Sequence, residues 1–170
     1  DEPPMVFPVR EEDQRFVEGW LGERGLSPGR LVAVNPAAGQ EIKQWPAERF
    51  GRLAATLHQA GWTPIVTGAP QDRALGDAVQ AASGGVCVDA VGATSLRQLP
   101  ALLGQCELFV GGDTGPMHIA QAAGTRVLAL FGPTNAARLG PRAPQHRTIY
   151  RPGPMAAISE SEVTEVVREM

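Results

Sequence analysis

The chain has 170 residues, 43% of them hydrophobic and 19% charged, which suits one folded domain and excludes an intrinsically disordered chain. A formal net charge of −3 argues against nucleic-acid binding as its main activity. No stretch has the pattern of a signal peptide or the length and hydrophobicity of a membrane span.

The domain organisation is expected to be simple. Residues 1–9 are rich in proline and predict an interdomain linker whose upstream domain is missing. Residues 10–158 follow as one α/β domain. Residues 159–170 form a C-terminal helix whose apolar residues share one stripe, so this helix should dock on a neighbouring surface.

Six apolar runs predict strands, and several show little alternation, as expected when helices cover both faces of a sheet. These strands are expected at residues 31–35, 63–67, 86–89, 107–110, 126–131 and 147–150. The apolar spacing between them predicts helices at residues 11–24, 46–60, 70–83, 95–103 and 114–123. This alternation predicts a Rossmann-like, doubly wound parallel sheet. In the common strand order 3-2-1-4-5-6, the first and fourth strands are neighbours.

Local signals refine two of these helices. Pro46 suits the first turn of the second helix, because proline needs no backbone N–H there. Ser95 and Gln98 have the spacing of a capping box, which predicts that the fourth helix begins at this point. Leu96 and Leu99, together with Leu103, are expected on its buried face.

The two most unusual loops follow the first and fourth strands, at residues 36–43 and 111–116. The expected strand order places them side by side, where open α/β sheets bind ligands. The fourth-strand loop, Gly111-Gly112-Asp113-Thr114-Gly115-Pro116, leads into a helix start, which offers unpaired amides and a partial positive charge to a phosphate. Lys43 ends the other loop and could hold a diphosphate, or it could be a solvated lysine.

Other polar residues near these loops have two readings each. Asp113 either caps the helix or contacts sugar hydroxyls, while the amides of Thr114 and Gly115 would face a phosphate. His118 lies about one turn further on and is either structural or directed into the same cleft. After the second strand, Gln71 or Asp72 could bind a ribose, or Asp72 could be a charge at a helix N-terminus.

Several common chemistries leave no signature in the sequence. There is no Walker A motif, no HExxH, no Ser/His/Asp arrangement and no metal-ligand cluster, and the first strand is not followed by GxGxxG. The two cysteines, Cys87 and Cys106, are expected to be buried reduced thiols, as in a cytosolic protein. A basic group near the C-terminus is either a solvated rim or a surface for an anionic partner; it comprises Arg138, Arg142, His146, Arg147 and Arg151.

Three motifs together resemble the heptosyltransferase family, glycosyltransferase family nine. They are Asn35-Pro36-Ala37-Ala38 with Lys43-Gln44-Trp45-Pro46, Gly111-Gly112-Asp113-Thr114-Gly115-Pro116-Met117-His118, and Leu130-Phe131-Gly132-Pro133-Thr134. The resemblance extends over residues 31–141. It implies the GT-B architecture, in which two Rossmann-like domains face each other across a cleft. This chain resembles the C-terminal, donor-binding domain, and the N-terminal acceptor domain is missing.

The resemblance also implies an activity: transfer of heptose from ADP-heptose to the inner core of lipopolysaccharide, with inversion. The protein is expected in the cytoplasm or at the cytoplasmic face of the inner membrane. No metal or other cofactor is expected if Lys43 and the amides of Thr114 and Gly115 suffice to stabilise the leaving group. The partners would be the ADP-sugar, a lipopolysaccharide precursor and the acceptor domain, with no nucleic acid. That missing domain would carry the general base, so this fragment alone should be inactive. Two alternatives stay open: a GT-B-type sugar-nucleotide epimerase and a non-catalytic nucleotide-binding module.

By the same resemblance, Lys43 matches the lysine that contacts the donor phosphate and would stabilise the leaving group. Asp113, Thr114, Gly115 and His118 match the donor-binding loop, and Gln71 or Asp72 falls where members bind the ribose. Ala38 and Gly39 stand where some members carry hydroxyl residues. Thr94 aligns near a methionine that lies beside the adenine in some members.

Overall fold

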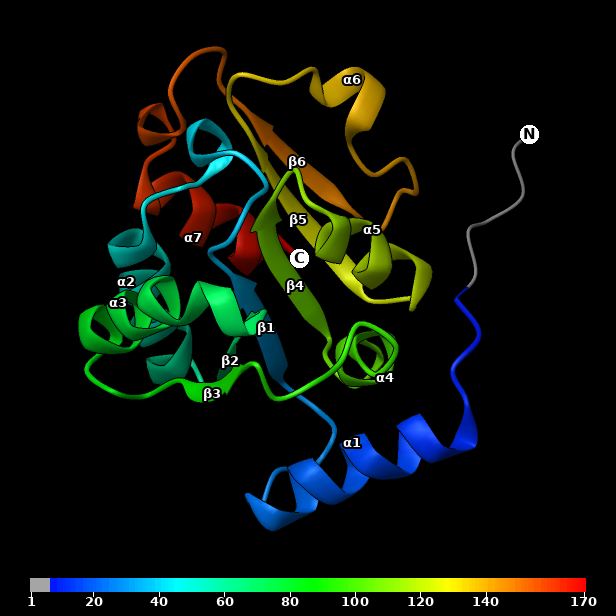
Figure 1. The fold of residues 1–170 in the computed structure, drawn as a ribbon. Coiled ribbons are helices and arrows are strands. Elements are labelled where there is room, and N and C mark those ends of the chain that lie inside the picture. Colours follow the sequence, from blue (N-terminus) through cyan, green and yellow to red (C-terminus); the bar gives the residue numbers. More distant parts are fainter. Residues whose placement is uncertain (1–6) are drawn as a thin grey trace.

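A computed structural model describes residues 7–170, so most of the proposed linker, residues 1–6, lies outside the described residues. Within residues 7–170, one parallel sheet of six strands has the order β3-β2-β1-β4-β5-β6 (Figure 1). The strands are β1 (Leu31–Asn35), β2 (Thr63–Gly68), β3 (Val88–Val91), β4 (Leu108–Gly112), β5 (Arg126–Phe131) and β6 (Arg147–Tyr150). This confirms the predicted fold class and the predicted neighbourhood of the first and fourth strands.

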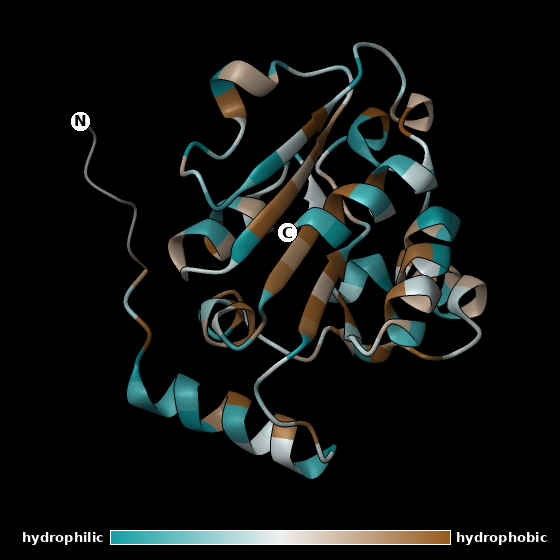
Figure 2. Cartoon of the chain, turned by 180° about the vertical axis from the view of Figure 1, so that it is seen from behind, coloured by the Kyte–Doolittle hydropathy of each residue, from teal (hydrophilic) through white to brown (hydrophobic). Residues whose placement is uncertain are grey.

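Helices cover both faces of the sheet and bury two apolar clusters. The first face packs against α2 (Ala47–Gln59), α3 (Arg73–Ser83) and α7 (Glu160–Glu169). The second packs against α1 (Glu11–Glu23), α4 (Leu99–Gly104) and α5 (Gly115–Ala122). Along β1, Val32 and Val34 face the first cluster while Leu31 and Ala33 face the second. Both strand faces are therefore apolar, and the central strands show this hydrophobicity along their length (Figure 2).

Several predicted elements begin later than expected. The third strand starts at Val88 rather than at residue 86, because the Cys87 carbonyl accepts a hydrogen bond from Gln80 Nε2 at 2.7 Å and the ladder with β2 begins at Val88. The predicted helix at 70–83 is a 3-10 turn, Pro70–Asp72, followed by α3. Pro46 stands at the N-cap of α2 rather than inside its first turn.

The fourth helix shows a larger difference. The Ser95–Gln98 capping box forms, with reciprocal bonds of 2.9 and 3.2 Å, but regular helix starts only at Leu99. Pro100 explains the delay, because proline fits the first turn of a helix and not its interior. Leu96 therefore leaves the predicted buried face and is 75% exposed.

The C-terminal helix docks within this chain. α7 begins with the capping box of Ser159 and Glu162, and its Val163 and Val167 are buried against the cluster that α2 also joins. Arg52 of α2 pairs with Glu160 at 2.6 Å. Trp45 is a packing residue: its ring meets Phe50 edge-on, and its indole N–H donates to the Ile158 carbonyl at 3.0 Å. No helix in residues 7–170 is long and apolar enough to cross a membrane.

His146 does not belong to an exposed basic group. It is 6% exposed, and its Nδ1 accepts a hydrogen bond from the Val127 backbone N–H at 3.0 Å, which requires an unprotonated nitrogen. Burial lowers the pKa of His146 below its ordinary value of 6.5. The imidazole is thus a neutral link between β5 and the segment that leads into β6.

The protein should lose stability as the pH falls through the range in which an unfolded histidine titrates. Below about pH 6.5 the unfolded chain binds a proton more readily than folded His146 does, so the free energy of unfolding decreases with falling pH. Urea unfolding at pH 7.5 and 5.5 measures this loss. A His146→Asn variant keeps an acceptor without a titrating ring, and its pH dependence should be smaller. An equal pH dependence in both proteins would contradict the assignment.

Candidate functional site

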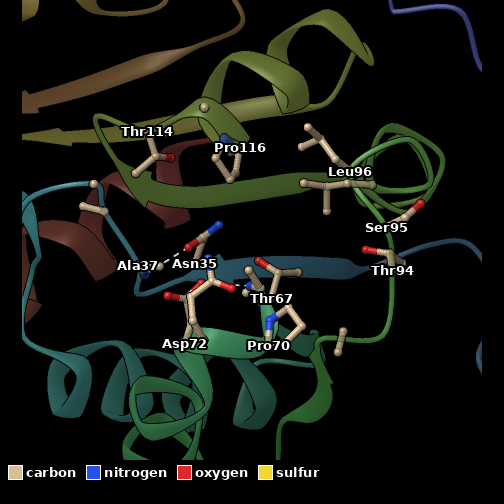
Figure 3. Close-up of a pocket in the computed structure, with 18 residues that line it drawn as sticks. Asn35, Ala37, Thr67, Pro70, Asp72, Thr94, Ser95, Leu96, Thr114 and Pro116 are labelled. Atoms are coloured by element: carbon tan, nitrogen blue, oxygen red, sulfur yellow. Dashed lines mark hydrogen bonds between the residues drawn. The ribbon is translucent and has the colours of Figure 1, made fainter.

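A pocket of about 540 Å³ opens at the carboxyl ends of β1, β2 and β4 (Figure 3). Residues from four loops line it: Asn35, Ala37, Ala38 and Gly39; Thr67 to Asp72; Ala90, Thr94, Ser95, Leu96 and Leu99; and Thr114, Gly115 and Pro116. This pocket therefore lies at the sheet edge where doubly wound folds bind ligands.

The end of β1 forms the pocket floor. Asn35 is 2% exposed, and its Oδ1 accepts the Ala37 backbone N–H at 3.0 Å, which turns the chain sharply away from the strand. Thr67 from β2 lies beside it, and its hydroxyl lies 3.4 Å from the Val34 carbonyl (Figure 3). Ala38 and Gly39 follow the turn and line the pocket with backbone and small side chains.

The loop after β2 forms one wall. Asp72 Oδ2 accepts the Ala69 N–H at 2.8 Å, which shapes the loop. The other carboxylate oxygen has no hydrogen bond within residues 7–170 and remains able to accept one from a ligand hydroxyl. Gln71 and Asp72 both line the pocket. Asp72 thus has a structural role, and it stands where the sequence placed a ribose contact.

The start of α5 forms the facing wall. Thr114, not Asp113, is the N-cap, because its hydroxyl accepts the Met117 N–H at 3.3 Å. Pro116 has no N–H, so Gly115 carries a first-turn amide that the helix itself does not use. Gly115 lines the pocket, and a Cβ added there would meet nothing within 4 Å. The positive end of the α5 dipole therefore opens onto accessible space.

Lys43 and Asp113 connect the two predicted loops. Lys43 Nζ lies 3.3 Å from Asp113 Oδ2, and the two side chains are 24% and 10% exposed. The loops also touch through their backbones, since a Cβ added to Gly112 would come within 2.9 Å of the Lys43 carbonyl oxygen. The strand order and this pair together bring an ammonium group beside the helix start that follows Asp113.

The structure separates the predicted site residues into two groups. Seven line the pocket: Ala38, Gly39, Gln71, Asp72, Thr94, Thr114 and Gly115. Lys43 and Asp113 form an ion pair next to Thr114, outside the pocket lining, and His118 is a half-buried residue further along α5.

Sequence reasoning missed the apolar lining. Pro70, Ala90, Leu99 and Pro116 face the pocket together with the exposed Leu96. Pro116 stood inside a motif already singled out, so it could have been included. The others resemble ordinary core or loop residues in sequence, and only the placement of their loops brings them to one cavity. Pocket lining that includes two prolines and a leucine offers apolar surface to a flat ring system.

Two kinds of reactive group were considered in the sequence, metal ligands and thiols, and the structure describes both. No group of three or more His, Cys, Asp or Glu side chains in residues 7–170 could hold a metal ion. Cys87 and Cys106 are buried and unbridged, and burial raises the pKa of the Cys106 thiol to about 12. At neutral pH Cys106 is therefore a protonated thiol and no nucleophile.

Comparison with known families gives one match that covers most of the chain. The model described as glycosyltransferase family 9 (heptosyltransferase) matches residues 5–165. Lipooligosaccharide heptosyltransferase 2 of Haemophilus influenzae is 33% identical over 122 residues, or 68% of this chain and 33% of that protein. Lipopolysaccharide core heptosyltransferase OpsX of the same organism is 28% identical over 142 residues, or 82% of this chain and 40% of that protein.

Solved structures share the fold. Escherichia coli ADP-heptose LPS heptosyltransferase II has a TM-score of 0.82 at 24% identity, over 99% of this chain and 54% of that one. E. coli heptosyltransferase WaaC with ADP has a TM-score of 0.74 at 20% identity, over 99% and 51% of the two chains. This chain thus spans 33% and 40% of the two curated relatives and about half of these solved chains.

Proposed function

We propose that this chain, which belongs to glycosyltransferase family 9 (heptosyltransferase), is the donor-binding half of an inverting glycosyltransferase that uses an ADP-sugar. One observation carries the proposal. Lys43 pairs with Asp113 directly before the start of α5, and Thr114 and Gly115 of that start line a pocket whose lining also includes apolar side chains. A nucleoside diphosphate carries groups that suit both features: a flat ring for the apolar lining and a negatively charged diphosphate for the ammonium group and the helix start.

The pocket suggests a pose for this ligand. The adenine ring would lie against the apolar side chains of Pro70 and Leu96, near Thr94. The ribose hydroxyls would donate to the free oxygen of Asp72, beside Gln71. The diphosphate would then reach the amides of Thr114 and Gly115 and, beyond them, Lys43. In this pose Asp113 is the counterion of Lys43, which keeps the carboxylate turned to the ammonium group, and His118 stands behind the donor loop.

The proposed chemistry follows from where charge develops. As the bond between the sugar and the diphosphate breaks, negative charge grows on the leaving oxygen. Lys43 and the first-turn amides would stabilise that charge more than the ground state, which lowers the barrier. A charge-assisted hydrogen bond contributes about 1.5–3 kcal/mol, or roughly a tenfold to hundredfold change in rate. These donors could neutralise the leaving group without a metal ion.

The sugar and the acceptor are proposed from the relatives. Their names carry heptose and lipopolysaccharide or lipooligosaccharide, so we propose ADP-heptose as the donor and a lipopolysaccharide-core precursor as the acceptor. The acceptor and the general base would lie on a second domain, joined through residues 1–9. Residues 10–158 with the helix 159–170 would form the donor domain. The reaction would take place at the cytoplasmic face of the inner membrane.

Titration calorimetry with ADP, UDP and ADP-heptose tests the proposal. We expect the 170-residue chain to bind one ADP, to bind UDP at least about tenfold more weakly, and to bind ADP-heptose without consuming it. A preference for UDP would instead favour a sugar-nucleotide epimerase. If no nucleotide binds, the proposed function is wrong.

A further inference from the structure

Residues 94–96 form the outer wall of the pocket, and this short segment makes few hydrogen bonds to the rest of the fold. Thr94, Ser95 and Leu96 line the pocket between β3 and α4, outside the sheet ladder. The Ser95–Gln98 capping box fixes the segment to the start of α4. Leu96 nevertheless exposes 75% of its surface at the rim. Something besides local hydrogen bonding must hold this wall in place.

Arg97, the next residue, provides a connection to α1. Its Nε lies 3.2 Å from Asp13 Oδ2, and a terminal guanidinium nitrogen lies 3.3 Å from Glu12 Oε1. Both carboxylates belong to the first turn of α1, which is far from this segment in sequence. Arg97 thus contacts α1 while the three residues before it face the pocket.

Asp13 makes this more than a surface ion pair. Asp13 is 1% exposed, and its Oδ2 has no hydrogen bond of good geometry within residues 7–170. Burying a carboxylate without a nearby cation costs free energy of folding. The Arg97 guanidinium is therefore kept next to Asp13. Asp13 cannot easily move, because Val17, Trp20 and Leu21 anchor α1 in the core beside α4.

We infer that Arg97 is a positioning residue for the ligand: by pairing with Asp13 and Glu12 it holds the 94–96 wall at the distance that lets Leu96 cover the nucleotide base. The position of α1 thereby influences the affinity of the pocket for a nucleoside diphosphate. This inference rests on the proposed function, because it takes the ligand to be a nucleoside diphosphate.

The matched test compares Arg97→Ala with Arg52→Ala. Arg52 also joins two elements through a carboxylate, at 2.6 Å from Glu160, and the two arginine side chains are 52% and 55% exposed, but Arg52 lies away from the pocket. Titration with ADP should show a Kd about fivefold higher for Arg97→Ala, because the wall must be ordered on binding, and no change for Arg52→Ala. Arg97→Lys should give an intermediate Kd, since one ammonium group cannot span both carboxylates.

Hydrogen exchange without ligand separates this inference from the proposed function. Amides of residues 94–98 should exchange faster in Arg97→Ala than in wild type or Arg52→Ala. Unchanged exchange would overturn the inference, and so would faster exchange with an unchanged ADP affinity. If wild type binds no ADP, the proposed function fails, while the exchange comparison still supports or refutes the link between α1 and the wall.

Discussion

Replacing Lys43 by alanine should weaken ADP binding by at least about tenfold, or 1.4 kcal/mol, and should also lower the melting temperature, because Asp113 loses its partner. Two effects add up. The variant loses the ammonium group proposed to meet the diphosphate. It also leaves Asp113, whose side chain is 10% exposed, without its partner and close to incoming negative charge. Titration calorimetry with ADP and thermal unfolding of the same preparations measure the two quantities.

Asp113→Asn is the matched variant for this experiment. It removes the charge that neutralises Lys43 and keeps a side chain of nearly the same shape. We expect ADP to bind Asp113→Asn at least as tightly as wild type, because the phosphate no longer competes with a carboxylate. The double variant should bind ADP better than Lys43→Ala alone. If Asp113→Asn loses as much affinity as Lys43→Ala, the pair is a structural brace and Lys43 does not contact the ligand.

Gly51→Ala should be the most destabilising small substitution that we propose. Gly51 lies where α2 crosses α3, and an added Cβ would come within 2.5 Å of Ala82 Cβ and 2.6 Å of the Val79 carbonyl oxygen. The two helices must separate to admit it, which costs about 2 kcal/mol and lowers the melting temperature by roughly 6 °C. Since α3 follows directly on the Asp72 turn, ADP affinity should fall as well.

Gly19→Ala is the control for the intrinsic preference of alanine for helices. Gly19 lies inside α1, and an added Cβ there meets nothing within 4 Å. This variant should gain up to about 1 kcal/mol of stability, because alanine loses less backbone entropy than glycine in a helix. Thermal or urea unfolding of both variants decides the matter. If both substitutions stabilise the protein, the close packing of α2 on α3 is wrong.

Much of the fold could be predicted because its signals are local. The apolar runs of β1 and β5 end at residues that cannot continue a buried strand, and the predicted limits of β1, β5 and β6 match the structure. The strand order is the common one for doubly wound sheets, and that order alone predicts that the loops of Lys43 and Asp113 are neighbours, as they are in the structure.

The features that were missed depend on contacts between distant residues. Nothing near His146 in sequence shows that its ring accepts a hydrogen bond from Val127, so it was grouped with exposed arginines. The pairing of Arg97 with Asp13 joins segments with no shared motif. Leu96 was placed on a buried helix face because its spacing fitted, whereas Pro100 shifts the helix start beyond it. Spacing alone does not distinguish a leucine that is buried in the core from one that is exposed at the edge of a pocket.

Backbone NMR of the chain during titration with ADP tests most directly whether the loops that follow β1 and β4 bind a diphosphate. We expect the amide signals of Thr114 and Gly115 and of residues 37–43 to shift together, in proportion to the fraction of protein bound. The signals of Leu96 and its neighbours should follow with the same affinity. Shifts confined to other surfaces, or no shift at saturating ADP, would contradict the account.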